Sequence, residues 1–495
     1  MAGFDALLHV YGTTEPSALP RRLVAGQLSL EITNGAVRNL RWKGVEVLRA
    51  MDYPVRNADW GTFAAETVFE EFTEAATNFE YRRTFTVERT LFKGCFTCSG
   101  ADSGKVTASL ELRAETPARV NRAGFVILHP VAGVAGSPLR VTHRGDSVEL
   151  SAFPRNIAPN QPALDIVGLR QVANGVLADI WFAGEVFEME DQRSWTDASF
   201  KTYCRPLSLP FPFELPPGET VVQSVTVQMS GGGETQDSTP EKPITLGRGT
   251  GRKLPQLALA LEEGWEATAE ARPFVRASAT LMRLDVTKPG WKQTLECLVE
   301  STFGALDLEV IVSESFAELG VELALLGANG IAPRSILALP KSWLKNQPTD
   351  AAWRDGASPA EAAAVARGCF PQSEIGCGFL TNFTELNRHP TAARLGDFIS
   401  HGTSAIVHAA DDISVMQTLE ALPQVFASAE ALAPGKSYRL GLVSIGMRSN
   451  PYGAEVAPNP EGVRRPMAMI DPRQRGLFAA AWMVGAMAAT ETSRV

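Results

Sequence analysis

The stretch that decides the fold reads SILALP (335–340), PAEAAAVARGC (359–369) and EIGCGFLTN (374–382). The first and third pieces are short apolar runs of the length typical of buried strands, whereas the middle piece has helical spacing. A strand, a helix and a second strand in this order predict a βαβ unit with two parallel strands.

The same alternation continues on both sides of this unit. Further strands are predicted at QLALALEE (256–263), SATLMRLDV (278–286), LDLEVIVSE (306–314), SAIVHA (404–409) and YRLGLVSIG (438–446). Helices are expected at residues 412–432 and 475–490. Seven strands in total predict an α/β, (βα)8-like TIM barrel over residues 251–495 that is incomplete at its C-terminal end and lacks its last strand.

The first half of the chain has a different rhythm. LSLEITNGAVRNLRWKGVEVLRAM (28–51) alternates apolar and polar residues, with turn signals at Asn34-Gly35 and Lys43-Gly44. Many such strands and few helical patterns predict a β super-sandwich over residues 1–235. A run rich in Gly, Ser, Thr and Pro follows, so residues 236–250 are expected to form a linker between two domains.

Bulk composition excludes several classes of protein. The 495 residues carry a net charge of −9, which disfavours nucleic acid as a partner. No apolar run is long enough for a membrane span and no signal-peptide pattern opens the chain, so we expect a cytoplasmic protein without a membrane partner. Cys95 and Cys98 form a lone CxxC, and nucleotide-binding motifs are missing, so neither a metal nor another cofactor is expected; the oligomeric state is left open.

The segment GEVFEMEDQRSWTDASFKTY (184–203) has an unusual density of polar and aromatic side chains. If WFAGEVFEME (181–190) is one strand, Glu188 and Glu190 share a face. Paired carboxylates raise one pKa, which suits acid–base chemistry, while aromatic rings and cations suit a sugar acid. A salt-bridged sheet edge is the equally acceptable structural alternative. The candidate site residues of this segment are Glu190, Asp191, Arg193, Trp195, Asp197, Lys201 and Tyr203.

This segment is also the point at which the chain resembles a known family. FEMEDQRSWTDASFKTYCRPL (187–207) is similar to the signature stretch of the D-apionate lactonases. Further similar stretches are VRNADWGTF (55–63), FPRNIAPNQP (153–162), GFLTNFTELNRHP (378–390), VHAADDISVMQTLEAL (407–422) and IGMRSNPYG (445–453).

The resemblance implies both an architecture and a reaction. It implies an N-terminal β domain followed by a TIM-barrel-like domain, which agrees with the periodicity. It also implies hydrolysis of D-apionolactone to D-apionate in bacterial apiose breakdown, with a small sugar lactone as the partner. It assigns no catalytic residue. Relatives continue beyond ATETSRV (489–495) with another strand and further β structure, so the C-terminal closure of the barrel and its full activity are left open at this point.

In the barrel half, candidate residues follow the predicted strands, because barrel chemistry lies at the strands' carboxyl ends. Glu385 could instead form a loop salt bridge, and Arg448 could form a helix-terminal ion pair. His408 with Asp411 could bind a metal ion, or Asp411 or Asp412 could cap a helix, which is the alternative we favour. The residues at the strand ends are Arg283, Asp285, Glu314, Lys341, Glu385, Asn387, Arg388, His408, Asp411, Asp412, Arg448 and Asn450, of which Glu385, Asn387, His408, Asp411, Arg448 and Asn450 are the candidate site residues.

These residues suggest a mechanism with two rival bases. Glu190 or Glu385, with Asp191 as a further candidate, would activate water against the lactone carbonyl. Lys201, Arg193 or Arg448 would stabilise the oxyanion. A glycoside hydrolase is an alternative, although no Glu follows the fourth or seventh predicted strand. A non-catalytic carbohydrate-binding protein is the other alternative.

Overall fold

A computed structural model describes residues 2–232, 247, 251, 254–261, 277–347, 349, 356–453 and 455–493. The chain forms two compact units. The β unit comprises Pro16–Gln192 and Ala198–Arg248, and the barrel unit comprises Met1–Glu15, Arg193–Asp197 and Gly249–Val495. The first segment and Arg193–Asp197 thus pack with the barrel unit, although the sequence placed both in the β domain. The expected linker, residues 236–250, lies outside the described residues except for Gly247.

The β unit consists of strands and short connections. Its strands are β1 (Arg21–Ala25), β2 (Leu28–Thr33), β3 (Ala36–Trp42), β4 (Val45–Asp52), β5 (Val55–Arg56), β6 (Ala65–Glu74), β7 (Asn78–Val87), β8 (Phe92–Ala101), β9 (Lys105–Ala114), β10 (Ala118–Val120), β11 (Arg122–Ala123), β12 (Val126–Pro130), β13 (Pro138–His143), β14 (Val148–Ala152), β15 (Ala163–Ala173), β16 (Val176–Ala183), β17 (Phe187–Asp191), β18 (Ser199–Tyr203), β19 (Phe213–Leu215) and β20 (Thr220–Gly231).

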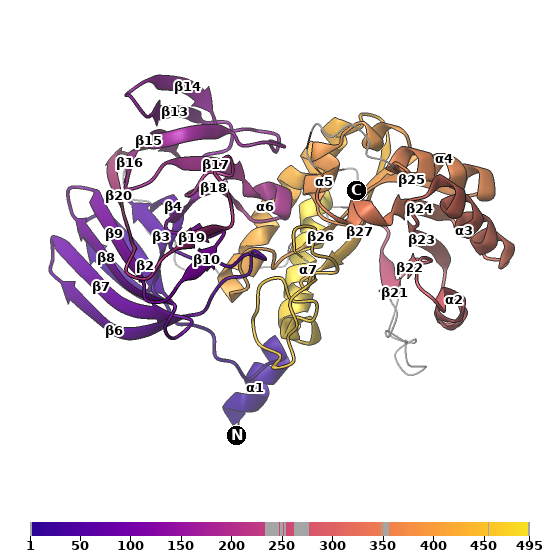
Figure 1. The fold of residues 1–495 in the computed structure, drawn as a ribbon, viewed down its shortest axis with the longest axis horizontal. Coiled ribbons are helices and arrows are strands. Elements are labelled where there is room, and N and C mark those ends of the chain that lie inside the picture. The colour runs from indigo at the N-terminus through magenta and orange to yellow at the C-terminus, as the bar shows by residue number, and fades with distance from the viewer. Residues whose placement is uncertain are drawn as a thin grey trace. The chain divides into compact units, whose positions relative to one another are not determined.

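Sixteen of these strands form one antiparallel sheet that folds back on itself (Figure 1). The order along the sheet is β1-β2-β3-β4-β12-β18-β17-β15-β16-β20-β9-β8-β7-β6, with β13 and β14 off this path. Because the sheet folds back, β4 lies near β15 and β16, and β1 lies near β7. Alternate side chains of both layers meet in one apolar core, which includes Leu40, Phe96, Phe125 and Val227.

The predicted strand WFAGEVFEME is in fact two strands. β16 ends at Ala183, the chain turns at Gly184, and β17 begins at Phe187. Gly184 has φ +91, and a Cβ there would lie 2.0 Å from the carbonyl oxygen of Val222. Only glycine fits this turn. Apolar residues on both sides concealed the break, but Glu188 and Glu190 still share one face of β17.

The barrel unit alternates strands and helices, with short 3₁₀ helices (η) between them. Its elements are α1 (Ala2–Tyr11), η1 (Gln192–Trp195, of which Gln192 falls in the β unit), β21 (Ala258–Leu261), β22 (Ala279–Asp285), α2 (Trp291–Glu300), β23 (Ala305–Val312), α3 (Phe316–Ala328), β24 (Ser335–Pro340), η3 (Lys341–Leu344), α4 (Pro359–Cys369), β25 (Glu374–Gly378), α5 (Phe383–Arg388), η4 (Ala392–Arg394), β26 (Phe398–Ser404), α6 (Asp412–Leu432), β27 (Ser437–Ser444), η5 (Pro472–Arg475), α7 (Leu477–Ala489) and η6 (Thr490–Thr492).

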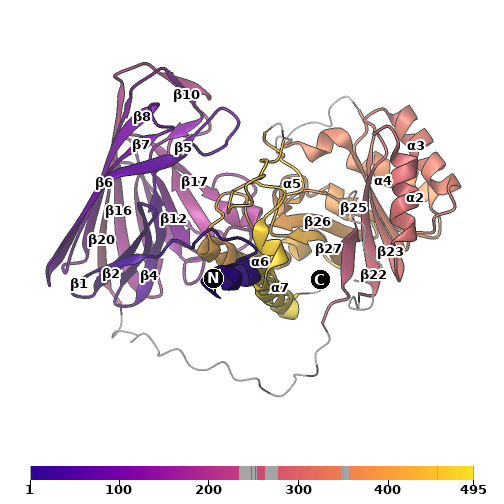
Figure 2. The ribbon, with the colours of Figure 1, turned by 90° about the horizontal axis from the view of Figure 1, so that it is seen from below.

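Strands β21 to β27 form a parallel sheet in sequential order within the described residues. Helices α2, α3 and α4 cover β22 to β25 on one side (Figure 2). The βαβ unit occurs where the sequence predicted it, and α4 has the predicted bounds. The sixth strand differs, since β26 is Phe398–Ser404 and SAIVHA follows it. None of the described helices has both the length and the hydropathy to span a membrane.

The start of helix α6 is fixed by an N-cap. The carboxylate of Asp411 accepts a hydrogen bond of 2.9 Å from the backbone N–H of Ser414. This bond satisfies one of the free amides in the first helical turn. Of the two aspartates considered from the sequence, Asp411 is the cap, and Asp412 is the first helical residue.

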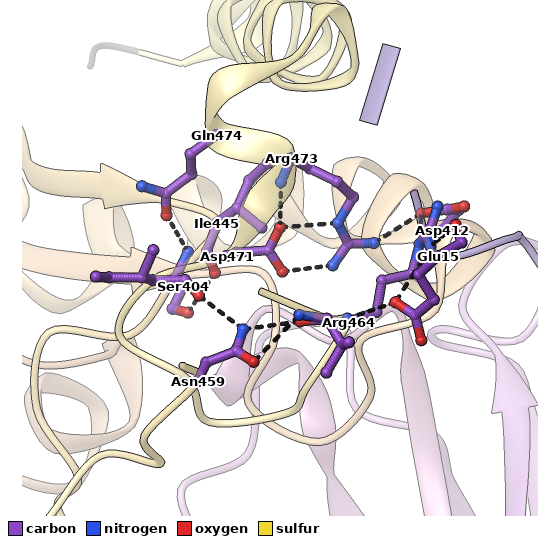
Figure 3. Close-up of polar contacts among 12 residues, drawn as sticks. Glu15, Ser404, Asp412, Ile445, Asn459, Arg464, Asp471, Arg473 and Gln474 are labelled. Carbon is purple, nitrogen blue, oxygen red and sulfur yellow. Dashed lines mark hydrogen bonds and ion pairs between the residues drawn. The ribbon is translucent and has the colours of Figure 1, made fainter. Parts of the chain in front are cut away.

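A buried ion-pair network joins α6 to the segment before α7 and to the end of the N-terminal segment (Figure 3). Arg473 is fully buried and pairs with Asp412 at 2.9 Å and with Asp471 at 2.7 Å. Arg464 pairs with Asp412 at 2.8 Å and with Glu15 at 3.3 Å. Because α1 also packs against α7 and η5, these contacts explain why residues 1–15 belong to the barrel unit.

Replacing Arg473 with Gln should destabilise the barrel unit strongly. Asp471 has an exposed side-chain fraction of 0%, so the substitution leaves a buried carboxylate without its cation. We expect the free energy of unfolding to fall by about 3–5 kcal/mol, measured by urea unfolding. The matched control is Arg465→Gln, because Arg465 makes an exposed pair with Glu461 that is worth less than about 1 kcal/mol. Equal losses in the two variants would contradict the structural role of the network.

Candidate active site

A polar pocket lies at the carboxyl ends of strands β25, β26 and β27. Its empty volume is about 280 Å³, part of which is open to solvent. Its lining residues are Arg283, Leu380, Thr381, Asn382, Gly402, Thr403, Ser404, Leu442, Ser444, Met447, Arg448 and Ser449. Loops that follow parallel strands converge at this edge, which explains why residues far apart in the sequence meet here.

The segment after β25 supplies the central polar group of the pocket. Thr381 and Asn382 follow the strand directly, and Asn382 is the N-cap position of α5. The hydroxyl of Thr381 donates a 2.8 Å hydrogen bond to Oε2 of Glu385, one helical turn further on. The short helix therefore holds a carboxyl group directly behind a pocket-lining hydroxyl.

Glu385 has the electrostatics of a proton acceptor. Its exposed fraction is 2%, and no hydrogen-bond partner for Oε1 exists within the described part of the chain. Burial raises the pKa of Glu385 to about 7, although the Thr381 hydrogen bond and the charge of Arg388 act in the opposite direction. A carboxyl group with this pKa can both take up and release a proton near neutral pH.

Two arginines line the pocket. Arg283 pairs with Glu309 at 2.7 Å, and Arg448 donates a 2.9 Å hydrogen bond to the carbonyl oxygen of Met469. The described lining residues include no Asp or Glu, and the charge of Arg283 is balanced by Glu309, so Arg448 is the lining cation that we consider for the chemistry. A developing oxyanion or a carboxylate is favoured in such a setting.

Arg193–Asp197 contacts the pocket residues within the barrel unit. The hydroxyl of Thr196 shares a 2.5 Å hydrogen bond with that of Thr403, which lines the pocket. The carbonyl oxygen of Ser194 accepts a 2.9 Å hydrogen bond from the hydroxyl of Thr384 in α5. Arg193–Asp197, part of the segment that the sequence singled out, is thus hydrogen-bonded to the end of β26 and to α5, the helix that follows β25.

Four predicted residues make contacts here, and three of them belong to Arg193–Asp197 itself. Asp197 and the Nδ1 atom of His408 form a 2.6 Å hydrogen bond. The ring of Trp195 lies 5.9 Å from that of His408 and 4.9 Å from that of Tyr452, measured between centroids. The guanidinium of Arg193 contacts the side-chain amide of Gln424. These interactions hold the segment against the loops that follow β26 and β27.

The remaining candidates of the segment lie in the β unit. Glu190 pairs with Lys201 at 2.5 Å across the paired strands β17 and β18. The buried carboxylate of Asp191 accepts a 3.0 Å hydrogen bond from the backbone N–H of Ala158. Burial raises the pKa of Tyr203 well above its usual range, and Glu190 and Glu188 add to the effect.

Three barrel candidates have structural contacts in addition to any role in a site. Asp411 caps α6, as described above. The side chain of Asn450 accepts hydrogen bonds from the backbone of Tyr452 and Gly453, which shapes the loop after β27. Asn387 is buried within α5.

Sequence reasoning did not single out the hydroxyl side chains of the pocket, among them Thr381, Thr403 and Ser404. Serines and threonines are too common for their type to mark a site, and only their position after a strand pointed to them. No cluster of three or more His, Cys, Asp or Glu side chains suited to a metal ion occurs within the described ranges.

A β-sheet unit combined with a parallel-strand barrel unit and a polar pocket at the strand ends is the architecture of a TIM-barrel protein with an added β domain. The family description "D-apionate lactonase, N-terminal domain" matches residues 8–232, and "D-apionate lactonase, TIM barrel domain" matches residues 257–495. The chain is 34% identical to a D-apionate lactonase from Brucella anthropi, over 97% of this chain and 81% of that protein. This chain therefore belongs to the D-apionate lactonase family.

Solved structures with partial similarity include sugar-acting proteins. A putative aldose 1-epimerase from Escherichia coli K12 has a TM-score of 0.30 and 10% identity, covering 43% of this chain and 99% of that chain. A GH36 α-galactosidase from Geobacillus stearothermophilus has a TM-score of 0.32 and 10% identity, covering 95% and 77%. At these scores neither similarity bears on function.

Glu385 predicts a pH-dependent difference in stability between the wild type and the Glu385→Gln variant. The folded-state pKa of about 7 exceeds the ordinary glutamate value of 4.5, so rising pH ionises the unfolded state first and destabilises the wild type. Gln does not titrate. Between about pH 5 and about pH 8 we expect the variant to gain about 3 kcal/mol relative to wild type in urea unfolding. A difference that is constant with pH would contradict the raised pKa.

Proposed function

We propose that this chain is a lactonase that hydrolyses a sugar lactone, most specifically D-apionolactone to D-apionate, in apiose catabolism. The observation that carries the proposal is the Thr381–Glu385 hydrogen bond of 2.8 Å at the wall of a pocket that Arg448 also lines. Membership of the family supports the same reaction, since the relative from Brucella anthropi is named D-apionate lactonase.

In the proposed reaction, Glu385 acts as the proton acceptor through Thr381. A water molecule on the pocket side of Thr381 attacks the lactone carbonyl carbon. Its proton passes to the Thr381 oxygen as the Thr381 proton passes to the Glu385 carboxylate. When the tetrahedral intermediate collapses, the ring C–O bond breaks, and the same relay returns the proton to the ring oxygen. The product is a hydroxy acid, which ionises at neutral pH.

Arg448 is the proposed stabiliser of the oxyanion, because its side chain lines the pocket. A guanidinium in a partly enclosed site stabilises negative charge on the carbonyl oxygen as it develops. Among the other cations considered, Lys201 pairs with Glu190 in the β unit, and Arg193 contacts Gln424. We assign Arg193, Trp195, Asp197 and His408 to positioning of the pocket loops.

Glu385 is preferred to Glu190 and Asp191 as the base. The carboxylate of Glu190 is occupied by Lys201 at 2.5 Å, and that of Asp191 accepts the Ala158 N–H. Either would have to give up a charged or backbone partner before accepting a proton. The substrate-side roles of Asn387, Asp411, Asn450, Lys201 and Tyr203 remain proposals of the sequence.

A glycoside hydrolase is the less favoured reading. Such enzymes commonly flank the scissile bond with two carboxyl groups. The described residues that line this pocket contribute none, and Glu385 lies behind Thr381. A purely binding role gives no reason to bury a carboxyl group with a pKa of about 7 behind a pocket hydroxyl.

The detailed architecture of the two units and the cellular location are also proposals. We propose that the β unit is a super-sandwich and that the barrel lacks its last strand, on the basis of the folded-back sheet and the seven described strands. A cytoplasmic location, and a small lactone in place of nucleic acid, are proposed from the composition and the net charge of −9.

Proton release during hydrolysis of D-apionolactone tests the mechanism. Removal of the relay in Glu385→Gln or Thr381→Val should lower kcat by about 10²–10⁴-fold. Thr381→Ser, which keeps the hydroxyl, should retain most activity. In the wild type, kcat should fall as pH drops through about 7, because Glu385 becomes protonated. Wild-type activity in Glu385→Gln would overturn the assignment, and lack of hydrolysis by the wild type would overturn the function.

A further inference from the structure

A second cluster of unsatisfied polar atoms lies in the β unit, on the short segment between β10 and β12. Asn121 and Arg122 have exposed fractions of 1% and 6%. Three of their side-chain atoms have no hydrogen-bond partner in the described part of the chain: Oδ1 of Asn121, and Nε and Nη2 of Arg122. Buried polar groups are almost always hydrogen-bonded, so three on adjacent residues require an explanation.

The hydrogen bonds of the other polar atoms show which side of the Arg122 guanidinium has no partner. Nη1 of Arg122 donates a 2.6 Å hydrogen bond to the carbonyl oxygen of Asn121. The amide nitrogen of Asn121 donates a 3.1 Å hydrogen bond to the carbonyl oxygen of Ala58. What remains of the guanidinium is the side formed by Nε and Nη2, which binds a carboxylate through two parallel hydrogen bonds.

Aromatic rings surround the guanidinium. Cζ of Arg122 lies 5.0 Å from the ring of Trp60, 5.5 Å from that of Phe211 and 5.6 Å from that of Tyr203. The rings of Trp60 and Phe211 contact each other edge-on at 5.3 Å, and Phe211 is 43% exposed. A partly exposed aromatic edge beside a buried cation suits a ligand that has both an apolar face and a charge.

Two side chains close to Arg122 influence its pKa. Tyr203 and Glu188 both favour the charged guanidinium, and Oε1 of Glu188 accepts hydrogen bonds from the Tyr203 hydroxyl and the Leu207 amide. Lys201 and Glu190 neutralise each other. Burial lowers the pKa of Arg122, as expected for a desolvated cation.

We propose that Arg122, Asn121 and the Trp60–Phe211 edge form a binding site for a small hydroxylated carboxylate. The ligand carboxylate accepts hydrogen bonds from Nε and Nη2 of Arg122, and a ligand hydroxyl donates to Oδ1 of Asn121. The aromatic edge covers the ligand's C–H face. This site is assigned from residues of the β unit alone and stands whether or not the barrel pocket hydrolyses a lactone.

Calorimetric titration of the full chain tests the site with two matched probes. D-gluconate carries a carboxylate and hydroxyls, and D-glucitol has the same chain with an alcohol in place of the carboxylate. We expect saturable binding of D-gluconate that is at least about tenfold tighter than binding of D-glucitol. Arg122→Lys keeps the charge but loses the two-nitrogen edge, and it should weaken D-gluconate binding at least about tenfold.

The control variants separate this site from general effects. Arg119→Lys alters an exposed arginine on neighbouring β10 and should leave D-gluconate binding unchanged. Trp60→Ala removes one ring of the aromatic edge, keeps the Arg122 side chain itself and should also weaken binding, so the site does not depend on the Arg122→Lys variant alone. Equal binding of the two probes, no binding of D-gluconate, or unchanged binding in Arg122→Lys would each overturn the site. Loss of binding in Thr381→Val alone would assign the ligand to the barrel pocket and would also overturn it.

Discussion

The barrel unit depends on the ion pairs that the fully buried Arg473 makes with Asp412 and Asp471. A guanidinium can be buried only if acceptors match its donors, and here two carboxylates from different parts of the chain do so. Asp412 begins α6 and Asp471 precedes α7, so the network links these two helices. The pocket lies at the carboxyl ends of β25, β26 and β27, and the members of the network do not line it.

Burial has the opposite consequence at Glu385. Arg473 meets its counter-charges, whereas Glu385 has one hydroxyl donor and a second oxygen without a partner in the described residues. The folded state therefore resists ionisation of this carboxyl group, which costs stability at alkaline pH. The same cost gives a proton acceptor that is poised near neutrality. Burial of Glu385 therefore lowers the stability of the folded chain above neutral pH, and the same burial gives the pocket a carboxyl group that can exchange a proton near neutral pH.

The sequence predicted the βα units because their apolar strands and their alanine-rich helix have distinct periods, and α4 has the predicted bounds. It failed at β26, whose residues His401, Thr403 and Ser404 are polar and yet buried. His401 is satisfied by the Tyr438 hydroxyl at 2.6 Å on the neighbouring strand, a partner that only the folded chain brings into reach. Glu385 could be found from its position after a strand. The hydroxyl groups of the pocket could not, because isolated threonines carry no distinguishing pattern.

Arg193–Asp197 lies between β17 and β18, which pair with each other in the β unit, yet its own contacts belong to the barrel unit. The two halves of the chain are consequently not interchangeable modules. A fragment that begins at residue 251 would carry the pocket without the Thr196 partner of Thr403 and without the Asp197 partner of His408. Insertions between Asp191 and Ser199 would disturb these five residues and therefore the barrel unit. A domain swap made at the main division between the units, near residue 248, would separate the same five residues from the barrel unit that they contact.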